Sequence, residues 1–214
     1  MGDALKVHAG TARGHPIFAA LYYVLLRRAE RKFLGAHRAH LAGLASGQVL
    51  DVGCGTGINF NYYPPEAEIV GIEPDPYMRK RAQARADRLR GRIKLLAEGA
   101  EDVPFPDASF DCAVATLVFC TIPDPDRALR ELRRVLRPGG QLRFLEHVRA
   151  ATPGWARFQD FTVPVWKRIG AGCHPNRDSV RAITQAGFRI VELNRYAFGP
   201  YPVRPFVRGV AARV

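Results

Sequence analysis

The chain contains 214 residues, of which 47% are hydrophobic and 24% charged, and its formal net charge is +12. This length is enough for one α/β domain with a short extension, and the composition excludes an intrinsically disordered chain. Four cysteines show neither a CxxC pair nor a histidine at zinc-ligand spacing: Cys54, Cys112, Cys120 and Cys173. We therefore expect free thiols in a reducing cytoplasm and no bound metal.

Most of the positive charge is arginine, gathered at Arg27–Lys32, Arg79–Arg92 and Arg127–Arg137 and through the C-terminal third. We interpret these clusters as solvated helix faces, because no aromatic-rich RNA-binding module accompanies them. A nucleic acid partner or an obligate protein partner is not expected, whereas attraction to an anionic membrane surface stays open.

The first apolar run, Ile17–Leu26, is about half the length that a membrane-spanning helix needs, and no small-residue cleavage site follows it. Its apolar residues recur at helical spacing and predict an amphipathic helix: Phe18, Tyr22, Leu25, Ala29 and Phe33. We interpret residues 1–46 as a helical cap or lid. The alternative is an interfacial helix that contacts a membrane peripherally.

From residue 47 onward, short apolar strands alternate with helical segments. This order predicts an α/β fold with a Rossmann-like, doubly wound seven-stranded sheet, mostly parallel with an antiparallel last strand. The predicted strands are Gln48–Val52, Glu68–Glu73, Ile93–Glu98, Phe110–Thr116, Gln141–His147, Phe188–Leu193 and Phe206–Val214. The predicted helices start near Gly57 and span Pro76–Arg90, Asp124–Leu136, Trp155–Ile169 and Arg177–Ala186. Because no linker interrupts this order, we expect residues 47–214 to form one domain.

A glycine loop, Gly53-Cys54-Gly55-Thr56-Gly57, follows the first strand, and Asp51 precedes it. Glycines let the backbone turn sharply and approach a ligand closely, and a helix N-terminus after the loop would offer N–H groups. Glu73, at the end of the next strand, can accept hydrogen bonds from both hydroxyls of a ribose. A dinucleotide fingerprint would need a third glycine at position 58, which is Ile58. These features predict a nucleoside-binding crevice that is not built for a dinucleotide.

The glycine spacing, with an acid two residues before it, resembles that of class I S-adenosylmethionine (SAM) methyltransferases. In that class the loop lies beside the methionine part of SAM, which carries a sulfonium, an amino group and a carboxylate but no phosphate. We therefore predict SAM rather than NAD as the cofactor. Many relatives place Asp at the position of Gly99, so we expect either Glu101 or the backbone of Gly99–Ala100 to read the adenine. The predicted cofactor-binding residues are Asp51, Gly53, Cys54, Gly55, Thr56, Gly57, Glu73, Pro74, Gly99, Ala100, Glu101, Thr116 and Leu117.

Methyl transfer from a sulfonium is an in-line displacement with an activated leaving group, so the protein mainly aligns and desolvates the reactants. A base is needed only when the nucleophile carries a proton. His147, at the end of the fifth predicted strand, is the candidate base; a histidine that is merely hydrogen-bonded at a strand end is the alternative. We predict that the acceptor pocket involves Tyr22, Cys120, Trp155 and Trp166, which could equally be core residues.

Longer motifs add a family resemblance. LDVGCGTG at 50–57, GAEDVPFPDASFD at 99–111 and RVLRPGG at 134–140 are similar to motifs of the ubiquinone/menaquinone C-methyltransferases. A second set resembles the methyltransferase-like protein seven family of alkyl-thiol methyltransferases: Asn59-Phe60, Tyr63-Pro64-Pro65, Thr116–Cys120, Glu146-His147-Val148, Trp155, Trp166 and Cys173. This resemblance implies a thiol acceptor. That family is anchored to membranes by a long hydrophobic segment, whereas the apolar run here is short, so membrane residence is not expected to carry over.

We therefore predict SAM-dependent methyl transfer to a small, fairly apolar acceptor, with a thiol or another heteroatom nucleophile as the leading expectation. A polyprenyl quinone or a phospholipid amine is the alternative acceptor. A non-catalytic SAM-binding protein, or an RNA-modifying partner that uses the positive charge, is the alternative from another class.

Overall fold

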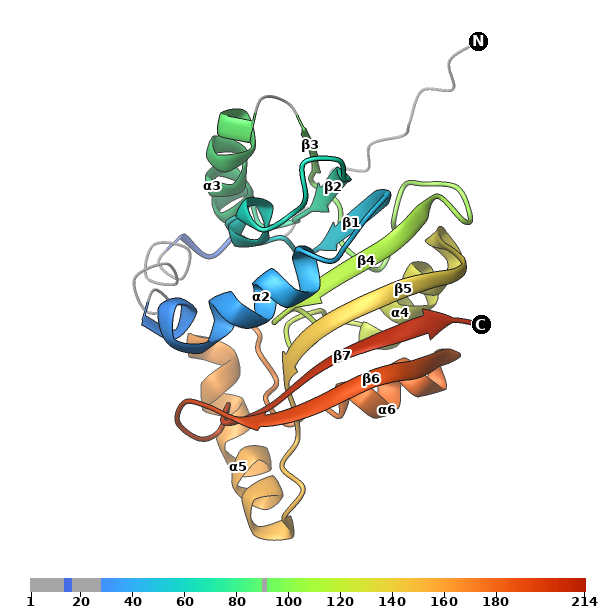
Figure 1. The fold of residues 1–214 in the computed structure, drawn as a ribbon. Helices are drawn as coiled ribbons and strands as arrows, with labels where there is room; N and C mark the ends of the chain where they lie inside the picture. The colour runs from blue at the N-terminus through green and yellow to red at the C-terminus, as the bar shows by residue number, and fades with distance from the viewer. Residues whose placement is uncertain (1–13, 17–27, 90–91) are drawn as a thin grey trace.

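A computed structural model describes residues 14–16, 28–89 and 92–214. Its centre is a seven-stranded sheet in the order β3-β2-β1-β4-β5-β7-β6 (Figure 1). The strands are β1 (Gln48–Val52), β2 (Glu68–Ile72), β3 (Ile93–Leu96), β4 (Phe110–Thr116), β5 (Leu136–His147), β6 (Phe188–Ala197) and β7 (Pro205–Arg213). Pairing from β3 to β5 is parallel, and β7 runs antiparallel to both β5 and β6. The predicted mostly parallel, doubly wound sheet with an antiparallel last strand is confirmed.

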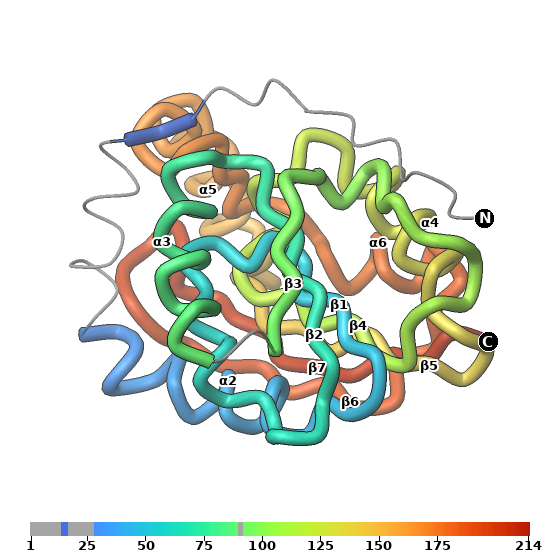
Figure 2. Tube along the Cα trace, turned by 90° about the horizontal axis from the view of Figure 1, so that it is seen from above, coloured from blue at the N-terminus to red at the C-terminus, as the bar shows by residue number. Residues whose placement is uncertain are grey.

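Helices cover both faces of the sheet (Figures 1 and 2). They are α2 (Gly35–Ala42), α3 (Pro76–Ala86), α4 (Pro125–Val135), α5 (Pro153–Ile169) and α6 (Ser179–Gln185), with a π-helical turn η1 (Glu30–Leu34) before α2. Side chains alternate between the faces along each strand. Leu50 of β1 packs with Leu129 of α4 and Ile183 of α6, whereas Val49 packs with Ala42 of α2 and Ala82 of α3.

Local chemistry explains where α3 and α4 begin. Each follows an Asp-Pro pair, in which the aspartate caps the helix and proline occupies the first turn. Asp75 accepts hydrogen bonds from the backbone N–H groups of Tyr77 and Met78, and Asp124 accepts one from Arg127. Along α4, the apolar residues at helical spacing are buried: Ala128, Leu129, Leu132 and Val135.

The prediction of a helix after Gly57 is wrong. The chain forms only a 3₁₀ turn there, η2 (Ile58–Asn61). Pro64 and Pro65 follow closely and cannot continue a helix, because proline lacks the backbone N–H donor and clashes with the preceding turn. The loop therefore has no long helix behind it, and any ligand contact depends on the loop backbone itself.

Several predicted element ends also move, and three of them move by four residues or more. β5 begins at Leu136 rather than Gln141, because Leu136 pairs with Phe110 across an irregularity in the β4–β5 ladder. β6 extends to Ala197 through its pairing with β7. The helix predicted over Pro76–Arg90 ends at Ala86, and a 3₁₀ turn η3 (Asp87–Leu89) follows.

Within the predicted cap, the segment from residue 28 to residue 42 packs on the sheet. Leu34 and Leu41 are buried against Leu145 of β5 and Phe206 of β7, and Phe33 stacks on Phe198 with ring centroids 4.3 Å apart. Most of the predicted amphipathic helix, including Tyr22, lies outside the described residues. Among the helices that the structure describes, none has the length and apolar character needed to cross a bilayer.

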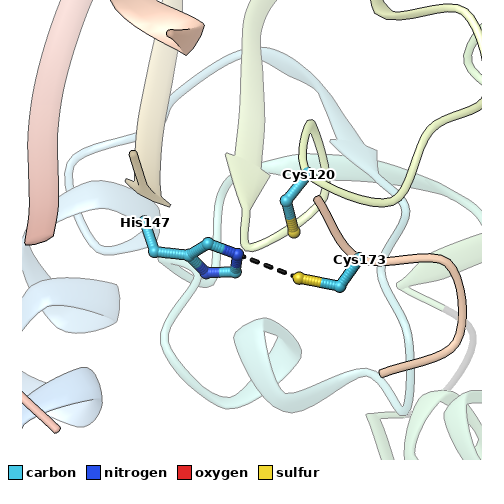
Figure 3. Close-up of side chains that lie close together, drawn as sticks. All are labelled: Cys120, His147 and Cys173. Carbon is cyan, nitrogen blue, oxygen red and sulfur yellow. Dashed lines mark hydrogen bonds between the residues drawn. The ribbon is translucent and has the colours of Figure 1, made fainter. Parts of the chain in front are cut away.

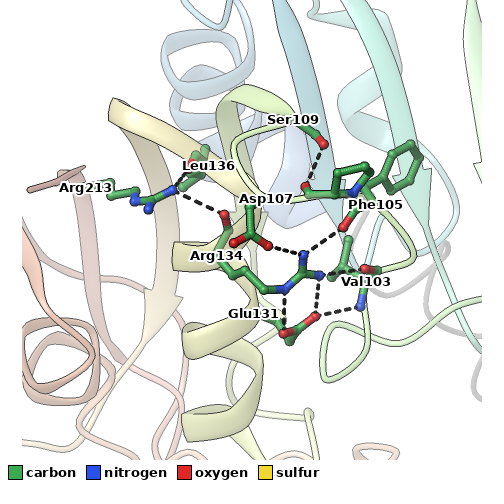
Figure 4. Close-up of polar contacts among 9 residues, drawn as sticks. Val103, Phe105, Asp107, Ser109, Glu131, Arg134, Leu136 and Arg213 are labelled. Atoms are coloured by element: carbon green, nitrogen blue, oxygen red, sulfur yellow. Dashed lines mark hydrogen bonds and ion pairs between the residues drawn. The ribbon is translucent and has the colours of Figure 1, made fainter.

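Arg134 of α4 fixes the loop between β3 and β4 (Figure 4). Its guanidinium donates to the carbonyl oxygens of Val103 and Phe105 and to the carboxylates of Asp107 and Glu131, at 2.8–2.9 Å. Glu131 in turn accepts from the backbone N–H of Val103. This loop directly follows Gly99–Glu101, the segment predicted to read the adenine, so Arg134 holds the chain next to that segment.

Candidate active site

A cavity of about 310 Å³ opens at the carboxyl ends of β1, β2 and β4, where ligands bind in open α/β sheets. It is lined by all the predicted cofactor-binding residues except Asp51 and Gly57: Gly53, Cys54, Gly55, Thr56, Glu73, Pro74, Gly99, Ala100, Glu101, Thr116 and Leu117. The fold therefore brings four predicted segments to one cavity: the glycine loop, the residues after β2, the residues after β3 and the end of β4.

The glycine loop leaves bare backbone facing this hollow. Gly53, Gly55 and Gly57 all have positive φ, at +55°, +58° and +76°, which favours glycine. A Cβ at Gly53 would lie 2.2 Å from Val118, and one at Gly57 would lie 2.6 Å from Phe60. A Cβ at Gly55 would meet only the carbonyl oxygen of Gly53, at 4.0 Å. Packing thus requires glycine at the two ends of the loop, while the middle glycine borders open space that a ligand can fill.

Glu73 is held in one orientation at the cavity wall. Its Oε2 accepts a hydrogen bond from the N–H of Gly55 and its Oε1 accepts one from the N–H of Asp75, both at 2.9 Å. Burial raises the pKa of Glu73 above its ordinary value, although these two bonds oppose the shift. Each carboxylate oxygen keeps a further acceptor site. This fits the two hydroxyl donors of a ribose.

The geometry after β3 explains why this chain has glycine at position 99, where many relatives have aspartate. A Cβ at Gly99 would lie 2.9 Å from Oε2 of Glu101, so the Glu101 carboxylate occupies the space next to residue 99. Glu101 also lines the cavity, as do Gly99 and Ala100. The arrangement agrees with the expectation that Glu101 or the adjacent backbone reads the adenine.

A polar network that the motifs did not identify lies beneath the cavity. Arg38 of α2 is 4% exposed, lines the cavity and donates to Oγ1 of Thr116 at 2.6 Å and to Oδ1 of Asn59 at 2.7 Å. Asn59 donates to Asp51, which is fully buried. Burial raises the pKa of Asp51 to about 7, against the hydrogen bond from Asn59. Asp51 therefore helps to fix the orientation of Asn59, and with it the polar network beneath the cavity. Nothing local distinguished Arg38 from the neighbouring arginines in the sequence.

The tip of β4 is strained. Leu117 has φ +58°, which is unfavourable for a residue with a side chain. Its N–H donates to the carbonyl oxygen of Leu145, while the fully buried Glu146 accepts from the N–H groups of Val118 and Phe119. Burial raises the pKa of Glu146 to about 7. This strand end is thus held tightly where the donor and acceptor are expected to meet.

Behind that end lies a cluster of three buried side chains, Cys120, His147 and Cys173 (Figure 3). Nε2 of His147 lies 3.0 Å from Sγ of Cys173, and the three potential ligand atoms lie within 4.8 Å of one another. Hydrogen bonds from Cys120 and His147 lower the pKa of Cys173 to about 5. Burial opposes protonation of His147, but the hydrogen bond and charge of Cys173 outweigh it and raise the pKa of His147.

The cluster changes how the predicted residues are grouped. His147 and Cys120 contribute to it and do not line the cavity. Trp166 adjoins it, since its indole helps to lower the pKa of Cys173. Trp155 is 44% exposed and stacks on Tyr201, with ring centroids 3.7 Å apart. Whether His147 acts as a base and whether the four predicted acceptor residues touch an acceptor stay predictions.

Residues 50–144 match the family described as a methyltransferase domain. Over 209 residues the chain is 35% identical to human thiol S-methyltransferase TMT1B, a match that covers 92% of this chain and 86% of the relative. It is 37% identical to human thiol S-methyltransferase TMT1A, covering 77% and 70%. The ubiquinone/menaquinone biosynthesis C-methyltransferase UbiE of Methylobacterium nodulans is 33% identical, covering 71% and 66%.

Solved structures share the fold. A SAM-dependent methyltransferase of Aquifex aeolicus superimposes with a TM-score of 0.65 at 18% identity, covering 94% of this chain and 100% of that one. One from Methanosarcina mazei gives 0.64 at 23% identity, covering 82% and 96%. Family and fold together imply SAM as the methyl donor. The chain is a class I SAM-dependent methyltransferase and belongs to the family that contains the thiol S-methyltransferases TMT1A and TMT1B.

Proposed function

We propose that this enzyme transfers the methyl group of SAM to the sulfur of a small, fairly apolar thiol in a reducing cytoplasm. The observation that carries the proposal is the extent of the similarity to the human thiol S-methyltransferase. It spans 92% of the chain, whereas the general methyltransferase domain ends at residue 144. The remaining residues include His147, Cys173 and α5, which lie on the side expected to receive the acceptor.

The chain's own residues divide the work of holding SAM. Glu73 would accept the ribose hydroxyls, and the backbone around Gly55 would lie against the methionine part. Arg38, a buried cation at the cavity wall whose Nε pairs with Glu30 at 3.2 Å, would also contact the carboxylate of that part. Glu101 and the adjacent backbone would contact the adenine. When bound, SAM supplies a methyl group that is already activated by its sulfonium.

A thiol acceptor must lose its proton before its sulfur can attack the methyl group. With an ordinary thiol pKa of about 8.5, only a few per cent of the acceptor is the reactive thiolate at neutral pH. The site must therefore stabilise the thiolate or remove its proton. The Cys120, His147 and Cys173 cluster borders the acceptor side and contains groups suited to this task. An alcohol of the same length has a far higher pKa and should not react.

The test is turnover with labelled SAM and a matched set of acceptors. The set contains an alkyl thiol, the alcohol of the same chain length, a demethylquinone analogue, phosphatidylethanolamine vesicles and bulk RNA. We expect label in the thioether and none in the alcohol. Label only in the quinone, the phospholipid or RNA would overturn the thiol assignment. SAM binding in calorimetry without transfer to any acceptor would favour the non-catalytic alternative.

A further inference from the structure

We propose that Cys120, His147 and Cys173 form a zinc site whose fourth coordination position receives the sulfur of the acceptor. This inference rests on the proposed thiol acceptor. It revises the expectation of no metal, which considered only the spacing of the cysteines along the chain. The fold brings together residues from three segments: the loop after β4, the end of β5 and the turn after α5 (Figure 3).

The distances are close to those that zinc requires. Tetrahedral zinc has bonds of about 2.3 Å to sulfur and about 2.0 Å to nitrogen, which places its ligand atoms roughly 3.5–3.8 Å apart. Here Nε2 of His147 lies 3.0 Å from Sγ of Cys173, and all three ligand atoms lie within 4.8 Å of one another. Side-chain shifts of about 1 Å convert this arrangement into a coordination shell.

The donor set also suits zinc. Thiolates and imidazole are the ligands that zinc prefers over the harder cations, which favour oxygen. Two thiolates and a neutral imidazole balance the double charge of the ion. Within the described part of the chain, no fourth His, Cys, Asp or Glu completes the set. Three protein ligands with one open position are characteristic of catalytic rather than structural zinc.

The supporting backbone holds the two cysteines in place. The N–H of His174, next to Cys173, donates to the carbonyl oxygen of Cys120 at 2.8 Å, which ties the two segments together. Arg177 donates to the carbonyl oxygens of Phe119 and Ile122 on either side of Cys120. A site whose ligands are positioned before the ion arrives loses little conformational freedom on binding.

The cluster shares a wall with the SAM cavity. Val118 and Thr121, on either side of Cys120, line the cavity, and so does Ala171, two residues before Cys173. An acceptor sulfur bound in this cluster would therefore lie close to the SAM cavity. Bulk water has little access to the cluster, because Cys120, His147 and Cys173 are only 2%, 6% and 6% exposed.

The step balances as a simple substitution. The acceptor thiol coordinates zinc as its thiolate, and its proton passes to bulk solvent as the acceptor enters the site. Its thiolate attacks the methyl carbon, and the new carbon–sulfur bond forms as the old sulfonium–methyl bond breaks. The electron pair of that bond stays on the departing sulfur, which becomes the neutral thioether of S-adenosylhomocysteine. The methylated product is also a neutral thioether, a weak zinc ligand, and dissociates.

The first experiment measures metal binding without any turnover. The full chain is stripped with a chelator and titrated with Zn²⁺, followed by elemental analysis, and separately with Co²⁺, followed by absorption. We expect one ion per chain and the near-ultraviolet charge-transfer band of cobalt bound to thiolates. Addition of the alkyl thiol should strengthen that band, whereas the matched alcohol should leave it unchanged. Absence of stoichiometric metal and of the band would overturn the proposal without relying on any variant.

Variants then locate the site. Cys120→Ser and Cys173→Ser should each weaken zinc binding at least about a hundredfold, since even an outer partner of a ligand is worth about ten- to a hundredfold. Cys112→Ala is the matched control, because Cys112 is also a buried free cysteine but lies in β4 outside the cluster. It should bind zinc like the parent chain. Equal zinc binding by all three variants would place the ion elsewhere and reject the assignment.

Activity separates this inference from the proposed function. If the metal-free enzyme methylates the thiol at the full rate, the zinc proposal fails while the thiol assignment stands, and His147 returns as the candidate base. If zinc binds but no thiol is methylated, the proposed acceptor fails, and with it the role of the open position. Restoration of thiol turnover by Zn²⁺ in the stripped enzyme supports both.

Discussion

At the scale of single residues, Glu73 combines a fixed orientation with spare acceptor capacity. Two backbone N–H groups hold its oxygens, and the carboxylate faces a cavity whose expected ligand offers two hydroxyl donors. Its pKa is raised mainly by burial, so the ionised acceptor form is lost on acidification sooner than for an exposed glutamate.

We therefore expect Glu73→Gln to weaken SAM binding by about 1–3 kcal/mol, because two hydrogen bonds to a charged acceptor are altered. Calorimetric titration measures the effect. Glu68→Gln is the matched control, since Glu68 is an exposed acid on the same strand. For the parent enzyme, SAM affinity should also fall as the pH drops through the raised pKa of Glu73. Equal affinity of the Gln variant would remove the ribose assignment.

The glycine loop permits a test that separates backbone strain from ligand space. Gly55 and Gly139 both have positive φ, and a Cβ would meet almost nothing at either position. Gly55→Ala and Gly139→Ala should therefore each cost a similar 1–2 kcal/mol or so of unfolding free energy. Only Gly55→Ala, at the cavity, should also weaken SAM binding. If both variants bind SAM like the parent chain, the Gly55 backbone is not a SAM contact.

At the scale of secondary-structure elements, the loop after β3 depends on α4 through Arg134. Five hydrogen bonds from one guanidinium satisfy loop carbonyls and two carboxylates. A planar fork with several donors makes this possible, and a lysine ammonium cannot reproduce it.

Arg134→Ala should lower the free energy of unfolding by about 1–3 kcal/mol, because partly buried loop carbonyls lose their donor. Arg134→Lys should recover only a part of this loss. Denaturant unfolding measures both. Arg130→Ala provides the comparison, since Arg130 is exposed on the same helix and should change stability by no more than about 0.5 kcal/mol. An equal effect of the two alanine variants would show that the loop does not depend on Arg134.

Helix α5 presents an apolar row to solvent. Phe158, Phe161, Val165 and Ile169 follow helical spacing and are 41–83% exposed, and exposed basic side chains flank them at Arg157, Lys167 and Arg168. An apolar face beside cations suits the surface of an anionic bilayer. This is a second basis, beside the N-terminal segment, for proposing the peripheral membrane contact that the sequence offered as an alternative.

The double variant Phe161→Asp, Val165→Asp should lose most of its sedimentation with anionic vesicles, because it removes apolar contacts and adds repelled charges. Val191→Asp, at an exposed valine of β6, should sediment like the parent chain. If all chains stay in the supernatant at low salt, α5 has no such role.

At the scale of the whole molecule, burial of ionisable groups sets a dependence of stability on pH. The pKa of Asp51 is raised by burial from 3.8 to about 7. Between these values the folded protein keeps a proton that the unfolded chain releases, so stability must fall as the pH rises. The contribution of Asp51 to the free energy of unfolding is fully present below the pKa of the unfolded chain. It is lost as the pH rises through the pKa of the folded protein. A difference of about three pH units corresponds to about 4 kcal/mol at most.

We expect Asp51→Asn to remove this contribution. The unfolding free energy of the variant should therefore rise relative to that of the parent chain as the pH rises from about 4 to about 8. Denaturant titrations across that range measure the difference. Asp87→Asn, at an exposed acid after α3, should keep the parent's pH dependence. A constant difference between Asp51→Asn and the parent chain would contradict a buried, protonated Asp51.

The parts of this protein that its sequence predicted well are those controlled by neighbours along the chain. The strand ends at Val52 and Thr116 and the apolar stripe of α4 follow from local periodicity, and the loop glycines follow from φ values that other residues avoid. The predicted helix after Gly57 failed, although the prolines at 64 and 65 were the available warning. The SAM cofactor could be predicted because the glycine loop after β1 and Glu73 after β2 belong to consecutive strand units of the sequence.

The tertiary structure alone decided the rest. Arg38 reaches Thr116 across 78 residues of chain, and His147 reaches Cys173 across 26. Such meetings depend on strand order and on how helices cover the sheet, which linear spacing does not encode. The sequence by itself determined the sheet and the SAM-binding loop, because backbone conformation and amphipathic periodicity are local. Only folding could place two cysteines and a histidine together beside the cavity, because long-range proximity is a property of packing.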